Sequence, residues 1–325
     1  MKAAKLGEKG RTILDSFPSY LDRVEQWSKL PWVRWLYAAV IALAIIMLGW
    51  SVTHNWETLS SYDWKWNWRA LLLALICYCV SLLCAVCGWR DIMHALGVNL
   101  SLRKHWKVYT FTNLARRLPT AIWYASGRLL MYEQLKVAKR ITSMALIIEV
   151  FVTAYAGAIS GAIFTSIAGQ SVGWTETKWV YLVLFVGIIF VVRPQWALLM
   201  FNALQRYLDR SSIDITLNWR DTMRWTGIYT LNWMSGGFML YWMISILHPV
   251  PFRAILGVIS MWIVSGVAAS IFTTFLPFSF GPRELALTLL LSNLIPPPVA
   301  ATISVLSRVW LGINQLIWFG ISWLL

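Results

Sequence analysis

The feature that most constrains this chain is a series of long apolar runs separated by short, mostly basic segments. A bilayer core about 30 Å thick needs about 20 apolar residues per helix, so these runs predict membrane segments. They cover residues 35–52, 70–89, 143–167, 179–192, 225–247, 255–274, 283–294 and 300–325. Since 58% of the 325 residues are apolar, we expect an all-α polytopic integral membrane protein with about 8 membrane segments and no soluble catalytic domain.

Lysine and arginine predict the orientation, because heavily and lightly basic segments alternate along the chain. Residues 1–34, 90–140 and 193–224 hold seven, ten and five Lys+Arg, whereas residues 53–69, 168–178 and 248–253 hold two, one and one. Basic segments stay on the cytoplasmic side, so we expect a multi-pass protein of the cytoplasmic (inner) membrane with its N-terminus in the cytoplasm. Anionic membrane lipids explain the net charge of +14, and nucleic acid is not expected as a partner.

The first 34 residues differ from the rest in mixing charges with apolar residues at near-helical spacing. The apolar positions are Ile13, Leu14, Phe17, Leu21, Val24 and Trp27. This pattern predicts a cytoplasmic amphipathic segment over residues 1–34 that lies on the bilayer surface as an anchor. Residues 35–325 then form a single transmembrane domain. The run at 35–52 lacks a small-residue cleavage pattern, so we expect it to be retained as a helix.

Two stretches predict broken or re-entrant helices. Residues 101–140, around Leu118-Pro119, are too polar to span and too apolar for a solvated linker. Residues 276–284 contain Leu276-Pro277 and Gly281-Pro282, and a helix of about 12 residues follows, which at about 18 Å is shorter than the bilayer core. Each stretch contains Leu-Pro, Gly and Arg and is followed by a helix with one charged residue. The two stretches therefore resemble each other, which suggests an internal repeat. Interrupted segments at corresponding places in two halves indicate a transporter's binding site.

Glu149 and Arg308 are the charges least able to reach water, because each lies inside an apolar run. Each would cost about 2.5–3.5 kcal/mol at a helix centre, so both should face the bundle interior. Two explanations remain open. They form a structural ion pair with each other, or they line a polar cavity in which Arg308 meets an anionic ligand.

Further candidates for a phosphate or headgroup site lie in the two interrupted stretches. Gly281 permits a bend and Pro282 favours a helix start, so the N–H groups there, together with Arg283, would attract a phosphate. In the first stretch, Arg128 follows Gly127 within an apolar and aromatic context. The predicted substrate-binding residues are Arg128, Glu149, Gly281, Arg283 and Arg308, with Arg117, Trp123, Tyr124 and Glu284 as supporting residues. For Arg116 and Arg117, positive-inside bias is a better explanation than a binding role.

No pattern in the sequence predicts a metal or a cofactor. The four histidines lie in separate segments, and the motifs of nucleotide loops or hydrolase nucleophiles are absent. All four cysteines fall in the run at 70–89, where small packing residues explain them better than a zinc site.

Residues 113–158 and 276–312 resemble the transmembrane-domain family named after lysylphosphatidylglycerol synthase, also described as flippase-like. The resemblance rests on Leu-Pro, Trp, Gly-Arg and Glu149 in the first stretch, and on Leu-Pro, Gly281, Arg283-Glu284 and Arg308 in the second. It extends over most of the chain from about Val33. Two positions depart from the family: Thr120 follows the first proline where glycine is frequent, and Ser279-Phe280 replaces a further glycine of the second motif.

The resemblance implies the translocating half of such proteins, without the soluble aminoacyltransferase domain that follows it in some members. The leading hypothesis is therefore a flippase or transporter for an anionic phospholipid or a polyprenyl-phosphate-linked glycolipid. An alternative is a membrane-embedded glycosyltransferase with a lipid-linked donor, for which Glu57 or Asp63 could serve as acid or base. A third is an accessory subunit that docks a separate transferase. A homodimer or a partner glycosyltransferase is compatible with all three.

Charge alternation makes a topological prediction that cysteine labelling can test. Single cysteines at positions 60 and 213, in a lightly and a heavily basic segment, should react with an impermeant reagent from opposite sides of the membrane. Reaction of both from the same side would overturn the orientation.

Overall fold

The computed structural model describes residues 66–115, 122–168, 218–275 and 281–324, and these form helices without strands. The helices are α4 (Trp68–Ala95), α5 (Leu102–Ala115), α6 (Ile122–Gln134), α7 (Lys139–Ala168), α10 (Trp219–Leu247), η2 (Phe252–Ala254), α11 (Ile255–Phe275), α12 (Pro282–Leu291) and α13 (Pro297–Leu324). The predicted all-α fold is thus confirmed in this part of the chain. The segments expected at 1–34, 35–52 and 179–192 lie outside the described residues.

Four of the described segments are long and apolar enough to cross a membrane. They are α4, α7, the stretch Phe252–Ala269 that opens α11, and α13. By contrast, α12 has 10 residues, hence a length of about 15 Å, and cannot span. It begins where the sequence predicts, at Gly281-Pro282, and Gly281 has φ 109°, which residues with a side chain rarely adopt. The chain is therefore a membrane protein with interrupted helices.

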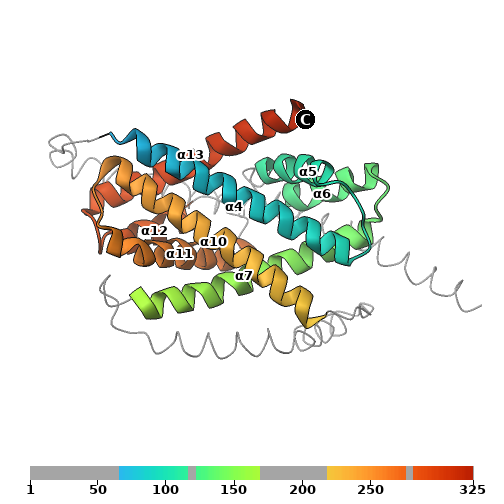
Figure 1. Cartoon of the computed structure of the whole chain (residues 1–325), viewed down its shortest axis with the longest axis horizontal. Coiled ribbons are helices and arrows are strands. Elements are labelled where there is room, and N and C mark those ends of the chain that lie inside the picture. Colours follow the sequence, from blue (N-terminus) through green and yellow to red (C-terminus); the bar gives the residue numbers. More distant parts are fainter. Residues whose placement is uncertain (1–65, 116–121, 169–217, 276–280, 325) are drawn as a thin grey trace, which may run out of the picture.

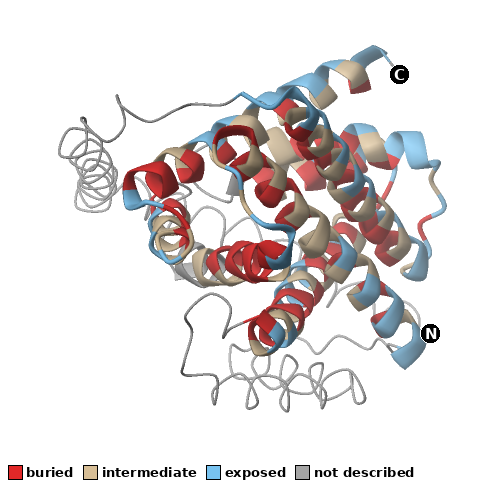
Figure 2. Cartoon of the chain, turned by 60° about the vertical axis from the view of Figure 1, so that its left-hand side comes forward, coloured by how far each residue is buried: buried red, intermediate tan, exposed pale blue. Residues whose placement is uncertain are grey.

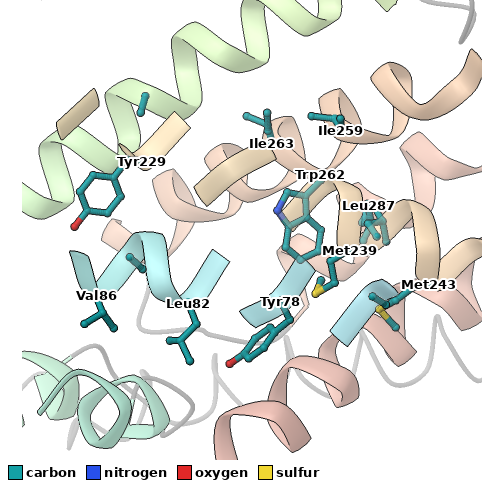
Figure 3. Packing of buried hydrophobic residues seen from close by; sticks show 14 of the residues in the cluster. Tyr78, Leu82, Val86, Tyr229, Met239, Met243, Ile259, Trp262, Ile263 and Leu287 are labelled. Atoms are coloured by element: carbon teal, nitrogen blue, oxygen red, sulfur yellow. The ribbon is translucent and has the colours of Figure 1, made fainter. Parts of the chain in front are cut away.

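The long helices α4 and α10 run side by side and form the centre of the bundle (Figure 1). Ser81 of α4 donates a hydrogen bond to Oδ1 of Asn232 on α10 at 2.6 Å. On its other side α10 packs closely on α11, because a Cβ at Gly237 would come within 2.7 Å of the Ile259 backbone. Figure 3 shows Trp262 of α11 near Met239 of α10 and Leu287 of α12 in the same core. Buried residues face these contacts while exposed ones face outward (Figure 2).

Contacts between helix termini define two ends of the bundle. At one end Arg224, near the start of α10, pairs with Asp91, near the end of α4, at 2.6 Å. The start of α5 and the end of α6 lie here too, because His105 and Tyr132 form one hydrogen-bonded group with Trp89 of α4. Exposed basic residues gather here, namely Arg90, Arg103, Lys104, Lys107, Lys136, Arg140, Arg220 and Arg224. We call this the basic end.

The two halves of the described structure run in opposite directions. Helix α4 runs toward the basic end, whereas α10 starts there and ends beside the start of α4, where the Asn67 N–H donates to Ile246 at 3.3 Å. Likewise α7 starts at the basic end, whereas α13 ends there, with Trp323 5.6 Å from Nζ of Lys107. The short helix α6 runs to the basic end and α12, which precedes the start of α13, runs away from it.

Contacts between the halves follow the same symmetry. Helix α7 packs on α11, and α13, its counterpart in the second half, packs on α5, the counterpart of α11. Each half thus has the same order of helices: α4, α5, α6 and α7 in the first half correspond to α10, α11, α12 and α13 in the second. This is the arrangement that an inverted internal repeat produces.

Candidate functional site

Two ion pairs each join a short helix to the long helix that follows it. In the first half, Arg128 of α6 donates to Glu149 of α7 at 2.5 Å. In the second half, Arg308 of α13 donates to Glu284 of α12. Glu149 lies ten residues after the first residue of α7, and Arg308 eleven residues after the first residue of α13. At about 1.5 Å per residue, both charges lie about 15 Å along their helices, well inside them.

The Arg128–Glu149 cluster is closed to solvent. Arg128 is 0% exposed and Glu149 3% exposed. Besides Arg128, the Glu149 carboxylate accepts hydrogen bonds from three tyrosine hydroxyls: Tyr109 at 3.1 Å, Tyr124 at 2.7 Å and Tyr229 at 3.2 Å. Four donors on one buried carboxylate compensate its loss of hydration, which is the condition for keeping a charge at this depth.

Aromatic rings cover the guanidinium of Arg128. Its central carbon lies 3.9 Å from the centroid of Trp89, 4.3 Å from Tyr109 and 4.4 Å from Tyr124. Nε donates to the Thr112 hydroxyl at 3.2 Å, while Nη2 has no hydrogen-bond partner among the described residues. Cation–π contacts are strongest when desolvated, so this cage holds four helices, α4, α5, α6 and α7, around one cation.

The Glu284–Arg308 pair differs in lying beside a cleft. The cleft is lined by Arg283, Glu284, Leu287, Ser304, Ser307, Arg308 and Leu311, and its enclosed volume is about 10 Å³, room for about one water molecule. The Arg308 side chain is 18% exposed and that of Glu284 3%. Arg283 places its guanidinium 4.0 Å from the Trp262 ring centroid. Two arginines and one glutamate therefore meet in a partly open space between α12 and α13.

Glu284 also caps its own helix. Its Oε2 accepts the Gly281 N–H at 2.8 Å, and its carbonyl accepts the Ser304 hydroxyl of α13 at 2.8 Å. The sequence predicts that N–H groups at this helix start await a phosphate. In the structure the helix's own carboxylate takes the Gly281 N–H, since an acid at the third helical position can reach back to it. The arginines, more than the helix terminus, are thus the groups that offer charge to a ligand.

The structure distributes the predicted site residues over two clusters. Glu149 and Arg308 do not pair with each other; each is bonded to an opposite charge on the neighbouring short helix. Gly281, Arg283, Glu284 and Arg308 come together at the cleft, whereas Arg128, Tyr124 and Glu149 form the closed cluster. Arg117 lies outside the described residues, and so does the side chain of Trp123.

Several residues that sequence reasoning missed complete both clusters. Around Arg128 they are Trp89, Tyr109, Thr112 and Tyr229, and at the cleft they are Trp262, Ser304 and Ser307. Helical spacing gives a signal for the serines, because Ser304 and Ser307 lie one turn before Arg308 and Leu311 on the same side of α13. For the tyrosines no local signal exists, since they come from α5 and α10 and meet Glu149 only in the folded bundle.

Comparison with known families decides the relationship of the chain. A model of the lysylphosphatidylglycerol synthase TM region matches residues 35–317. The chain belongs to this family. The matched residues include both halves of the described structure and both ion pairs. The resemblance predicted from the two motifs is therefore confirmed. Among proteins with curated descriptions, nothing matches the chain significantly.

The closed cluster predicts a large stability cost for one neutral substitution. Glu149→Gln leaves Arg128 buried without a counter-charge, so it should destabilise the protein by about 3–5 kcal/mol. Thermal unfolding in detergent would show this as a clearly lowered midpoint.

Glu133→Gln is the matched control, because Glu133 pairs with Lys139 at 3.0 Å at the protein surface. It should change stability by less than about 1 kcal/mol. If both variants unfold at the same temperature, the closed cluster does not stabilise the fold.

Proposed function

We propose that the protein is a lipid flippase that moves an anionic phospholipid or a polyprenyl-phosphate-linked glycolipid across the cytoplasmic membrane. The observation that carries the proposal is the cleft between α12 and α13, where Arg283 and Arg308 lie together beside Glu284. Membership in the lysylphosphatidylglycerol synthase TM-region family supports a role in lipid handling.

The charges of the cleft favour an anionic headgroup. With Arg283, Arg308 and Glu284 ionised, the lining residues sum to one positive charge. A phosphodiester carries one negative charge, so it neutralises the cleft, whereas a zwitterionic headgroup leaves the excess in place. Guanidinium groups also bind phosphate oxygens through two parallel hydrogen bonds. A phosphate on Arg308 would replace the carboxylate of Glu284, which holds the arginine when no ligand is bound.

The size of the cleft favours transfer of a headgroup with its tails outside. Pockets that enclose a small molecule measure roughly 300–1,000 Å³, whereas the enclosed space of this cleft is about 10 Å³, which is room for about one water molecule. A phosphate would therefore enter only as Glu284 releases Arg308, and a whole lipid could not fit. Leu306 and Val309 flank Ser307 and Arg308 on α13 and are exposed, which suits contact with acyl or prenyl chains. The headgroup would thus enter the protein while the tails remain in lipid.

The inverted arrangement of the two halves supports transport over catalysis. Inverted repeats with broken helices let one half move against the other around a central site. A transferase needs a carboxylate poised as acid or base, but Glu149 and Glu284, the carboxylates buried in the described structure, are both held by arginines. Glu57 and Asp63, the acids considered for an enzyme, lie outside the described residues.

Reconstitution in liposomes tests this function. The protein should accelerate flipping of fluorescent phosphatidylglycerol well above that of phosphatidylcholine. Arg283→Lys should slow flipping about tenfold with little effect on expression or detergent stability, because lysine cannot form the paired hydrogen bonds to phosphate.

Arg253→Lys is the matched control, because Arg253 is an exposed arginine of η2 away from the cleft. It should flip lipid at the normal rate. Normal flipping by Arg283→Lys would contradict the proposed role of the cleft, and absence of flipping with every anionic lipid would contradict the function.

A further inference from the structure

Helix α13 buries its polar residues and exposes its apolar residues, as expected for a membrane helix whose polar side chains face the bundle interior. The buried positions include Ser304, Ser307, Asn314 and Ser322, which are 1–4% exposed. Leu306, Val309, Ile313, Leu316 and Ile317 on the other side are 39–56% exposed. Ser304 and Ser322 are about 27 Å apart along the helix, which is close to the thickness of the hydrocarbon core. A polar face thus runs along almost the whole crossing.

This polar face begins at the cleft and continues along α5. Ser304, Ser307 and Leu311 line the cleft. Farther along, Trp318 contacts Trp106 of α5 at a ring distance of 5.5 Å, and Phe319 contacts Phe111 at 5.8 Å. We call the region formed by Trp106, Trp310, Asn314 and Trp318 the α5–α13 seam. It leads to the basic end, where Lys107 lies over Trp323.

Polar atoms in the seam have unused hydrogen-bonding capacity. Asn314 is 1% exposed; its Nδ2 donates to the Trp310 carbonyl at 2.9 Å, but its Oδ1 has no partner among the described residues. The indole N–H groups of Trp106 and Trp310 are also buried without acceptors there. Helix packing through small residues does not account for unpaired amide and indole groups, because leaving them unpaired is costly. Such groups are expected where water or a ligand passes.

We propose that the α5–α13 seam is the path by which the phosphate-bearing headgroup of a lipid moves from the basic end to the cleft. Exposed Arg103, Lys104 and Lys107 of α5 attract the anionic headgroup at the mouth. The indole N–H groups and Asn314 exchange hydrogen bonds with it on the way, and Arg308 and Arg283 receive it. This inference rests on the proposed function and adds the route and the residues that line it.

Cysteine reactivity along α13 tests the path. The four native cysteines, all on α4, are first replaced by alanine, and single cysteines are then placed in the full chain at neighbouring positions, 306 with 307 and 313 with 314. The two members of each pair lie at nearly the same depth but about 100° apart around the helix, one exposed and one buried. A small anionic thiol reagent, methanethiosulfonate ethylsulfonate, should modify 307 and 314 about tenfold or more faster than 306 and 313, because the reacting thiolate forms only where water is present. Equal rates within each pair would overturn the proposal.

A second arm identifies what occupies the path. Dihexanoylphosphatidylglycerol should slow modification at 314 severalfold, whereas dihexanoylphosphatidylcholine and inorganic phosphate should not. Equal protection by inorganic phosphate would assign the path to free phosphate, and absence of protection by any of them would assign it to water; either result contradicts a lipid path. If cysteine reactivity is the same on both faces while the reconstituted protein still flips lipid, the proposed path is wrong but the proposed function is retained.

Discussion

A charged side chain within a bilayer must find an opposite charge or water, and this requirement organises the described structure. Arg128 with Glu149 and Glu284 with Arg308 satisfy it in pairs, each between a short helix and the long helix after it. Because breaking either pair would leave a buried charge, the pairs hold α6 and α12 in place, and α12 is too short to span the bilayer by itself. The interrupted helices therefore depend on the ion pairs.

The two ion pairs differ in which helix carries the arginine and in how far they are exposed to solvent. In the first half the arginine is on the short helix, and in the second half it is on the long helix. Three tyrosine hydroxyls and three aromatic rings close the first pair, whereas the second lies beside a cleft with another arginine. The first pair is therefore sealed inside the bundle, whereas the second is accessible from the cleft.

Much of this arrangement could be predicted from the sequence. Apolar runs of sufficient length predicted α4, α7, α10, α11 and α13, and Gly281-Pro282 predicted the start of α12. The isolated charges Glu149 and Arg308 were predicted to face the bundle interior, because neither could reach water from within its apolar run. Glu149 is buried, whereas Arg308, with its side chain 18% exposed, faces the cleft. Their partners could not be predicted, because Arg128 and Glu284 resemble ordinary charges near the ends of apolar segments. Pairing depends on which helices meet, and single residues carry no local signal for it.

The polar face of α13 shows a similar limit. From the sequence alone, serines and an asparagine in an apolar run are compatible with helix packing and equally with the lining of a path. Only their burial beside α5 and the cleft distinguishes these two interpretations. The charge alternation already predicts opposite directions for α4 and α10, because α4 leads from a lightly to a heavily basic segment and α10 leads back. Which helices of the two halves correspond required tertiary contacts, because the basic segments carry no signal for it.

The most direct test of the account is an experimental structure of the protein in lipid nanodiscs with dihexanoylphosphatidylglycerol bound. We expect the phosphate between α12 and α13, with guanidinium nitrogens of Arg283 and Arg308 about 2.7–2.9 Å from its oxygens and Glu284 separated from Arg308. A phosphate bound elsewhere, with the Glu284–Arg308 pair intact, would contradict it.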